Sequence, residues 1–292
     1  MNMLEAAAGY CAATFQPCGS CGQCTHPSGR CSGSCRVCSE EVNYHRGGRA
    51  DYDCQNFMYY YMCRYAWKYC SEILYAVEEI DFSRPATYTI LSLGCGGAPD
   101  LMAFALHFDE KDGTNISYMG YDANPYWNII HALVYGYAQA HGIATKFFIK
   151  NIFDILADDK TELYSSNIVI LQYLISHFPP EKRYELAGML FDGLIRKVLK
   201  HPSRVSPTLF LLNDIDHADV RKYYDLFLEK LAQSDCSFSS MRRHFKERES
   251  DYGDGSVQYA SCNNRFSIPE TIKNDFDCAI KCSSAQLFVK VE

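Results

Sequence analysis

The chain has 292 residues, of which 48% are hydrophobic and 22% charged, values that are ordinary for a globular protein. Its formal net charge of −7 argues against a broadly basic surface for nucleic acid, although a local basic face is compatible with it. No apolar run approaches the ~20 residues of a membrane span, and the amino terminus lacks the basic residues of a signal peptide. We therefore expect no membrane partner and a cytoplasmic, reducing location.

Residues 1–50 are rich in cysteine and are predicted to form a separate module. Of the 15 cysteines, seven fall in the first forty residues, with few large apolar residues between them. Because such a segment cannot build an apolar core, a metal ion or cross-links must supply its folding energy. Short Cys-x-x-Cys spacings let two thiolates reach one tetrahedral ion. The predicted ligands are Cys18, Cys21, Cys24, Cys31, Cys35 and Cys38, with zinc favoured and an iron–sulfur cluster, disulfides or disorder as alternatives.

An aromatic helix is predicted in the second segment, residues 51–83, from about Tyr52 to Ile80. Large side chains recur there at helical spacing, namely Phe57, Tyr60, Tyr61, Arg64, Tyr65, Lys68 and Tyr69. The favoured interpretation is a helix packed as core against the edge of a sheet. In the alternative, some of these tyrosines close over a ligand or stack on a planar substrate.

A glycine-rich turn opens the third and largest predicted domain, residues 84–292. A buried strand is predicted over Tyr88–Leu93, followed by glycines at 94, 96 and 97 and a helix from about Ala98 to Phe108. These glycines let the backbone turn sharply and approach a ligand closely. The helix that follows offers unpaired N–H groups at its first turn to an anionic group.

A carboxylate is predicted beside this turn. The next strand, Ile116–Tyr121, ends on Asp122. At the tip of the second strand of a βαβ unit, an aspartate can accept two hydrogen bonds from a ribose diol.

The rest of the chain alternates between predicted helices and strands, which indicates a doubly wound α/β sheet. Helices are predicted over Pro125–His141, Pro180–Lys200 and from about Asp214 to Ala232, and strands over Thr145–Lys150, Asn167–Tyr173, Thr208–Asn213, Cys236–Lys246 and Ala285–Val291. Residues 247–264 are polar and are predicted to form a loop.

The order Leu-Gly-Cys-Gly-Gly, strand, Gly-Tyr-Asp resembles the class I S-adenosylmethionine-dependent methyltransferases. The resemblance covers roughly residues 84–292, and its specific part is Leu93–Pro99 with Asp122. It implies a seven-stranded doubly wound sheet with an antiparallel last strand. Pro99 replaces the third glycine of the dinucleotide-binding pattern, so the sequence looks less like a nicotinamide-binding domain. Asp122 lies further from the turn than the usual ~20 residues, and the polar run 109–115 looks like the lengthened loop responsible.

The resemblance implies an enzyme that binds S-adenosylmethionine at the carboxyl ends of the strands. The cofactor-binding residues it implies are Gly94, Cys95, Gly96, Gly97, Asp122, Ala123, Asn124, Asn151, Ile152 and Gln172. The glycines would cradle the methionine portion, Asp122 the ribose, and Asn151 with Ile152 the adenine, with Asp154 as the alternative to Asn151. Gln172, Tyr173 and His177 would face the methyl group as catalytic candidates, in a reaction that depends mostly on alignment. Asn167 stands where the family often has an acidic residue, which puts proton abstraction by that side chain in doubt.

Among methyl acceptors, the sequence favours RNA, because a predicted metal module and the basic stretch Arg242–Lys246 are both present. The acidic net charge and the unfamiliar cysteine spacing favour the alternative, a small molecule or a protein. A hypothesis of another class is a methyltransferase-like fold that serves as a binding or assembly module. Nothing in the sequence indicates an oligomeric state.

Overall fold

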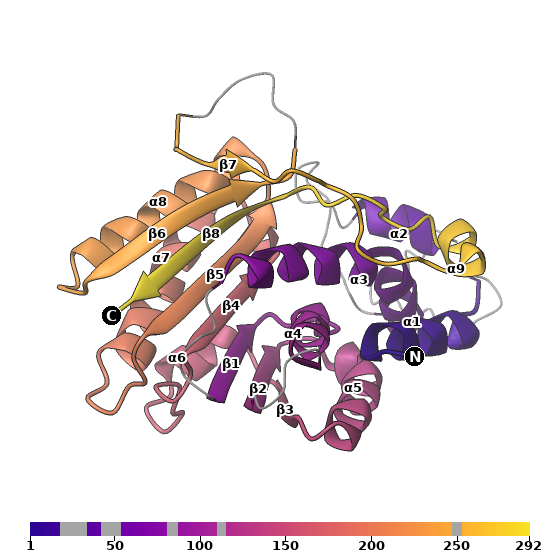
Figure 1. The fold of residues 1–292 in the computed structure, drawn as a ribbon, viewed down its shortest axis with the longest axis horizontal. Coiled ribbons are helices and arrows are strands. Elements are labelled where there is room, and N and C mark those ends of the chain that lie inside the picture. The colour runs from indigo at the N-terminus through magenta and orange to yellow at the C-terminus, as the bar shows by residue number, and fades with distance from the viewer. Residues whose placement is uncertain (18–33, 42–53, 81–86, 110–114, 247–252) are drawn as a thin grey trace.

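The computed structural model describes residues 1–17, 34–41, 54–80, 87–109, 115–246 and 253–292. These residues form an eight-stranded sheet with helices on both faces (Figure 1). The strands are β1 (Thr87–Leu93), β2 (Asn115–Asp122), β3 (Ala144–Ile149), β4 (Ile168–Gln172), β5 (Thr208–Ile215), β6 (Phe238–His244), β7 (Val257–Gln258) and β8 (Ser284–Val291). Their order across the sheet is β3-β2-β1-β4-β5-β8-β6-β7.

The pairing of the strands gives the sheet a parallel half and a mixed half. Strands β1 to β5 are parallel, whereas β8 runs antiparallel to both β5 and β6. This is the arrangement that the resemblance to class I methyltransferases implies. The count of seven strands was too low, because β7 adds an eighth strand parallel to β6 within a stretch predicted as a loop. A strand of two residues is too short to leave an alternating pattern in a sequence.

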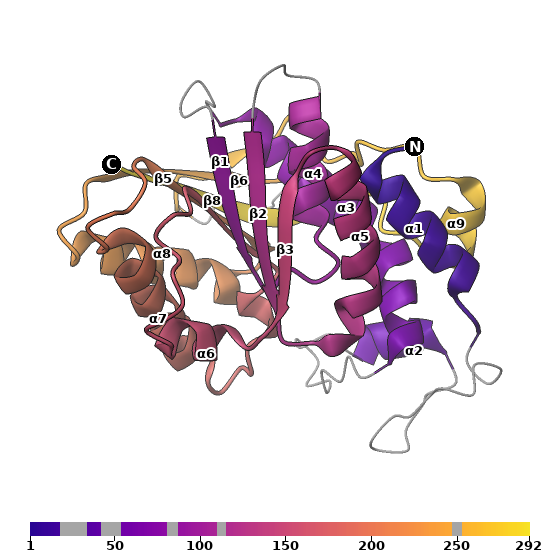
Figure 2. The ribbon, with the colours of Figure 1, turned by 90° about the horizontal axis from the view of Figure 1, so that it is seen from below.

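Helices cover the two faces of the sheet in two groups, which Figure 2 shows edge-on. One group contains α1 (Met3–Thr14), α3 (Gln55–Glu78), α4 (Pro99–Asp109) and α5 (Asn128–Ala140), and the other contains α6 (Ile152–Ala157), α7 (Arg183–Leu194) and α8 (Ala218–Ala232). A separate apolar core lies under each group. Since parallel strands are buried on both faces, the central strand β4 is apolar almost throughout, and all five of its residues are buried.

Helix α1 belongs to the first core, although the sequence analysis did not predict it. Asn2 and Glu5 form a capping box at its start. Its buried residues include Leu4 and Cys11, each 0% exposed, and the helix packs against α3. The stretch Leu-Glu-Ala-Ala-Ala carries too few large side chains to show an apolar stripe. Cys11 is therefore a core residue of the described fold.

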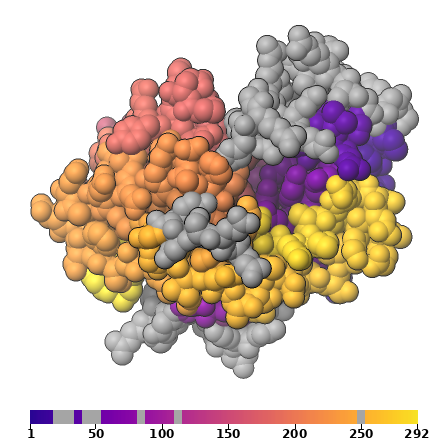
Figure 3. All heavy atoms as spheres, turned by 90° about the horizontal axis from the view of Figure 1, so that it is seen from above, coloured from indigo at the N-terminus to yellow at the C-terminus, as the bar shows by residue number. Residues whose placement is uncertain are grey.

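Helix α3 is the predicted aromatic helix. In space, it packs against α1 on one side and against the C-terminal segment that contains α9 (Glu270–Asp275) on another. Sixteen of its 24 residues are buried. Arg64 pairs with Asp277 at 2.9 Å, and the backbone oxygen of Arg64 accepts a hydrogen bond from the N–H of Ala279, also at 2.9 Å. Figure 3 shows the yellow C-terminal segment lying against the purple N-terminal part. Residues of the C-terminal segment that precede β8 thus pack against α3.

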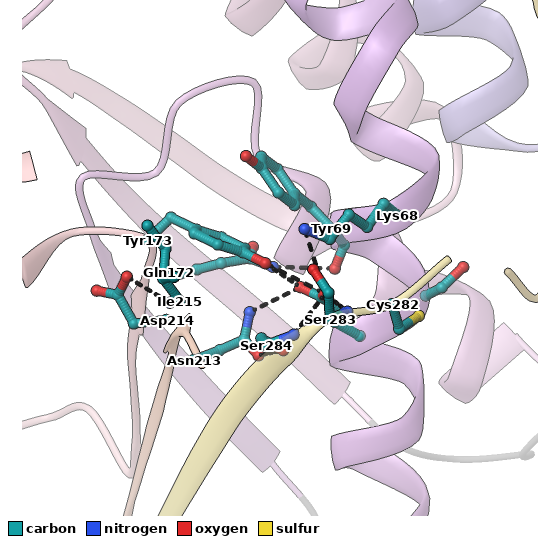
Figure 4. A network of polar contacts seen from close by, with 12 residues as sticks. Lys68, Tyr69, Gln172, Tyr173, Asn213, Asp214, Ile215, Cys282, Ser283 and Ser284 are labelled. Atoms are coloured by element: carbon teal, nitrogen blue, oxygen red, sulfur yellow. Dashed lines mark hydrogen bonds and ion pairs between the residues drawn. The ribbon is translucent and has the colours of Figure 1, made fainter. Parts of the chain in front are cut away.

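A buried carboxylate fastens α3 to the sheet. Glu72 is 0% exposed and accepts hydrogen bonds from the Tyr173 hydroxyl at 3.0 Å, the Ser283 N–H at 2.9 Å and Asn213 Nδ2 at 3.2 Å. Lys68 Nζ lies 3.7 Å away, one helical turn earlier. Figure 4 shows these partners converging from the ends of different strands. One side chain therefore connects α3 with the ends of β4 and β5 and with the start of β8.

We expect Glu72→Ala to lower the free energy of unfolding by about 3–5 kcal/mol, because buried donors lose their acceptor and Lys68 loses its counterion. Urea unfolding followed by circular dichroism measures this. Glu78→Ala is the matched control, because Glu78 pairs with Arg265 on the surface of the same helix, where such pairs contribute ~0–1 kcal/mol. Equal losses in the two variants would contradict the assigned role of Glu72.

Candidate active site

A cavity of about 430 Å³ opens at the carboxyl ends of the central strands, where the strand order reverses between β1 and β4. Ligands of open α/β sheets bind in such a crevice. All twelve residues predicted for cofactor binding or catalysis line it: Gly94, Cys95, Gly96, Gly97, Asp122, Ala123, Asn124, Asn151, Ile152, Gln172, Tyr173 and His177. Ser92, Asp100 and Trp127 also line the cavity, although the sequence analysis did not single them out.

The glycine turn is fixed tightly to β2. Gly94 and Gly96 have φ angles of 70° and 51°, in the left-handed region that glycine adopts at little cost. The N–H groups of Gly94 and Cys95 both donate to the backbone oxygen of Tyr121, at 2.8 and 3.0 Å. A Cβ atom at Gly94 would lie 2.8 Å from Leu174 Cδ1. The conformation of this turn therefore favours glycine, and a larger residue at position 94 would also require the Leu174 side chain to shift.

Asp122 connects the end of β2 to the glycine turn. Its Oδ2 accepts a hydrogen bond from the Gly96 N–H at 2.8 Å, and its Oδ1 accepts one from the Asn124 N–H at 2.9 Å. Burial raises the pKa of Asp122, and these two hydrogen bonds oppose the rise. Each carboxylate oxygen keeps a second lone pair for a ligand hydroxyl.

His131, on α5, supports the same turn from behind. Its Nε2–H donates to the backbone oxygen of Gly96 at 2.7 Å, and Nε2 lies 3.7 Å from Cys95 Sγ. The imidazole stacks on Phe147, with 4.2 Å between ring centroids. Burial lowers the pKa of His131 to about 4, so the ring is neutral at pH 7. In the sequence, a histidine within a mostly apolar helix was the one available signal.

Asn151 and Asn167 lie at opposite ends of the parallel strands. Asn151 follows β3 at the cavity and caps α6, where its Oδ1 accepts a hydrogen bond from the Phe153 N–H at 2.9 Å. Asn167 precedes β4, where it accepts from the Thr89 N–H at 2.8 Å and donates to the Thr87 oxygen at 3.1 Å. Asn167 therefore fastens β4 to β1 and does not line the cavity.

Aromatic side chains form the wall of the cavity beside the end of β4. Tyr173 has a φ of 51°, and its ring centroid lies 4.3 Å from that of Tyr69. The hydroxyls of Tyr69 and Tyr61 are 3.1 Å apart, and Tyr61 contacts Trp127 edge-on. Gln172 donates from Nε2 to the backbone oxygen of Tyr69 at 2.9 Å. Helix α3 is thus both part of the core and part of the cavity wall.

His177 completes the predicted catalytic set, at the end of the short turn η3 (Ile175–His177). Burial, with a smaller contribution from the positive charge of Arg183, lowers the pKa of His177 to about 4. The imidazole is therefore neutral near pH 7, and its lowered pKa makes it a weak base.

The basic stretch that favoured RNA lies on β6, and its two arginines are engaged in ion pairs. Arg242 pairs with Asp225 at 2.5 Å, and Arg243 pairs with Glu79 at 2.6 Å. The charges of both arginines are therefore balanced locally.

Two of the six predicted metal ligands, Cys35 and Cys38, lie in the helix α2 (Cys35–Glu41), and Cys18, Cys21, Cys24 and Cys31 lie outside the described residues. Asn56 contacts the residues on both sides of the stretch 18–33. Its Nδ2 is 2.5 Å from the backbone oxygen of Gln16 and 3.7 Å from Cys35 Sγ. The part of the chain that the structure describes contains no cluster of three or more metal-ligating side chains.

None of the described helices is long and apolar enough to cross a membrane.

No family model and no curated protein matches the sequence. Solved structures that resemble the chain include the plantazolicin methyltransferase in complex with SAH, at 9% identity, covering 88% of this chain and 97% of that chain with a TM-score of 0.48. A second is a putative class I methyltransferase from Listeria monocytogenes, at 14% identity, covering 76% of this chain and 58% of that chain with a TM-score of 0.43. A third is the magnesium protoporphyrin IX methyltransferase from Synechocystis PCC 6803, at 14% identity, covering 88% of this chain and 96% of that chain with a TM-score of 0.40. At these values we base no functional conclusion on the similarities.

We expect the stability of the fold to decrease as the pH falls from 6.5 to about 4, partly because of His131. The unfolded chain protonates this histidine near pH 6.5, whereas the folded imidazole takes up a proton only near pH 4. The unfolded state therefore binds more protons in this pH window. Across the whole window, the free energy of unfolding falls by about 3 kcal/mol on account of His131.

Urea unfolding at pH 7.0, 5.5 and 4.5 measures this loss. His131→Gln should flatten the decrease, although His177 still contributes, and His141→Gln at the exposed end of α5 should leave the decrease unchanged. The same slope in His131→Gln as in the native protein would contradict a neutral, buried His131.

Proposed function

We propose that this protein transfers a methyl group from S-adenosylmethionine to a nucleophilic acceptor. The observation that carries the proposal is the convergence, on one cavity, of the glycine turn, Asp122 and Asn151. These are the groups that the resemblance assigns to the methionine, ribose and adenine portions of the cofactor. The strand order, with β8 antiparallel between β5 and β6, supports the same proposal.

The donor set of the cavity suits this cofactor. Two carboxylates, Asp100 and Asp122, line the cavity, and the described lining contains no lysine or arginine. A dinucleotide would bring a negatively charged pyrophosphate into this environment, whereas S-adenosylmethionine brings a sulfonium and an ammonium group with only one carboxylate. Asn151 Oδ1 accepts one hydrogen bond and keeps a lone pair for an adenine amino group.

The bound cofactor would supply an electrophilic methyl group, and the residues of the chain bind, orient and exclude water. Gln172 and Tyr173 are held at the end of β4 by hydrogen bonds to α3, so their positions do not depend on a mobile side chain. The aromatic wall of Tyr61, Tyr69 and Trp127 would exclude water from this end of the cavity once the cofactor is bound. His177 lines the same cavity and is neutral at pH 7, and in this proposal it is the candidate that would take a proton from the acceptor. Alignment supplies most of the rate enhancement in such a reaction.

The acceptor we favour is an uncharged group of a small molecule or a protein, in preference to RNA. Arg242 and Arg243 are paired with carboxylates, and the described cavity wall is aromatic and acidic. Transfer of labelled methyl groups into separated RNA, protein and small-molecule fractions tests this choice. Label found in RNA alone would reverse it.

We expect the wild-type protein to bind S-adenosylmethionine in calorimetry, and Asp122→Asn to weaken that binding by about 1.5–3 kcal/mol, the scale of hydrogen bonds to a charged group. Asp192→Asn, which changes a surface carboxylate paired with Lys230, is the control and should leave binding unchanged. Absence of binding by the folded wild-type protein would favour the binding-module hypothesis.

We further propose that the cysteine-rich segment holds one or two zinc ions. The support is the spacing of Cys18, Cys21 and Cys24, followed by Cys35 and Cys38. Elemental analysis of freshly purified, reduced protein should find zinc, and a strong chelator should remove it without unfolding the sheet. Protein that contains neither zinc nor iron, with these cysteines paired as disulfides, would overturn the proposal.

A further inference from the structure

Two cysteines, Cys262 and Cys282, lie directly opposite each other on two paired segments that precede β8. An antiparallel bridge joins Asn263 to Lys281, and the Cys282 N–H donates to the backbone oxygen of Cys262 at 2.8 Å. In an antiparallel pair, the residues one step beyond such a bridge face each other, and their side chains stand on the same side. The backbone therefore turns the two thiols toward the same space.

The packing of the two side chains agrees with this register. Cys282 is 2% exposed and belongs to a small apolar cluster with Tyr75, Phe245 and Tyr259. Cys262 packs against the same cluster and is half-buried. Both are free thiols, and neither lines the cavity. They thus form a pair of neighbouring sulfurs outside the candidate active site.

The spacing of opposed residues permits a disulfide and strains it. Residues joined by a hydrogen bond across an antiparallel pair have Cα atoms about 5.5 Å apart, which lies within the range of disulfides. Their Cβ atoms are about 5 Å apart, compared with about 4 Å in a disulfide. We infer that Cys262 and Cys282 are a redox modification site at which a peroxide forms a reversible disulfide. Strain makes such a bond easy to reduce.

The two sulfurs have different parts in this reaction. Cys262 is the more accessible, whereas burial raises the pKa of Cys282 and keeps it a thiol. The Cys262 sulfur attacks a peroxide oxygen, so an S–O bond forms, the O–O bond breaks and hydroxide leaves, taking up the proton of the Cys262 thiol. The Cys282 sulfur then displaces the hydroxyl group, which leaves as water with the proton of that thiol. Two thiols and one hydrogen peroxide give one disulfide and two waters, and the cysteines lose the two electrons that the peroxide gains.

The disulfide would act on the cluster around Glu72. Ser283 follows Cys282 directly, and its N–H donates to Glu72 Oε1 at 2.9 Å. Figure 4 shows Cys282 beside Ser283 at this cluster. Glu72 in turn accepts from the hydroxyl of Tyr173, which lines the cavity. Closing the disulfide draws Cys282 toward Cys262 and pulls the Ser283 N–H from its acceptor, so oxidation reaches the cavity wall. This inference goes beyond the proposed function and stands without it.

Mass spectrometry of the full chain tests the pairing. Reduced native protein is treated with hydrogen peroxide, the remaining thiols are blocked, and trypsin is added. Cleavage after lysine and arginine leaves each of the two cysteines alone on its peptide, 249–265 and 282–290. We expect these peptides to be joined, and a dithiol reductant to separate them. Cys262→Ser should abolish the joined product, whereas Cys236→Ser, which changes another half-buried cysteine just before β6, should leave it unchanged.

Hydrogen exchange followed by NMR tests the connection to Glu72. The Ser283 amide should exchange about 10-fold faster or more in the oxidised protein, the scale of a lost hydrogen bond to a charged group. Peroxide should not change this rate in Cys262→Ser. An unchanged rate in protein that carries the disulfide would overturn the connection to Glu72.

Three outcomes of the mass spectrometry would overturn the modification site itself. They are oxidation of Cys262 to a sulfenic acid with no joined peptide, a bond from Cys282 to another cysteine such as Cys278, and two peptides that stay blocked and unlinked. The wild-type measurement needs no substitution, so it decides the inference even if Cys262→Ser fails to fold. None of these results depends on S-adenosylmethionine, and the proposed function stands or falls separately.

Discussion

The burial of Glu72 is the constraint on which the arrangement of the cavity depends. A carboxylate with no exposure must be surrounded by donors, and here those donors come from β4, β5 and the start of β8. The geometry of this cluster places α3 across the carboxyl edge of the sheet. Tyr61 and Tyr69 become part of the cavity wall as a result, since they lie on the same helix. The polar cluster around Glu72 and the apolar packing of α3 therefore together position the aromatic wall.

The glycine turn is fixed by a second set of contacts that does not involve α3. Tyr121 holds the amide groups of the turn, Asp122 holds the Gly96 amide, and His131 holds the Gly96 oxygen. The turn is thus held before any ligand arrives, and a ligand would meet oxygen and nitrogen atoms already in place. Such preorganisation reduces the cost of ordering on binding.

Much of this site could be predicted from the sequence, for physical reasons that differ by residue. Glycine positions and the acidic residue ending β2 are local signals, which is why Gly94, Gly96 and Asp122 were found. Asp100 was missed because an acid in the first turn of a helix has an ordinary explanation in the helix dipole. His131 and Glu72 could not be recognised, because their partners are far away in the chain: Gly96 for His131, and Tyr173, Asn213 and Ser283 for Glu72. Long-range contacts leave no periodic pattern in a sequence.

The contacts of Asn56 have a thermodynamic consequence for the stretch 18–33. By bonding the Gln16 oxygen and contacting Cys35, Asn56 brings the two ends of this stretch to one side chain on α3. In a free peptide, an ion shared between distant cysteines must first overcome the entropy of closing the chain into a ring, which grows with ring length. Here the folded helices have already closed that ring. The zinc site proposed for these cysteines would therefore be favoured within the protein over an excised peptide, by a chelate effect that the fold supplies.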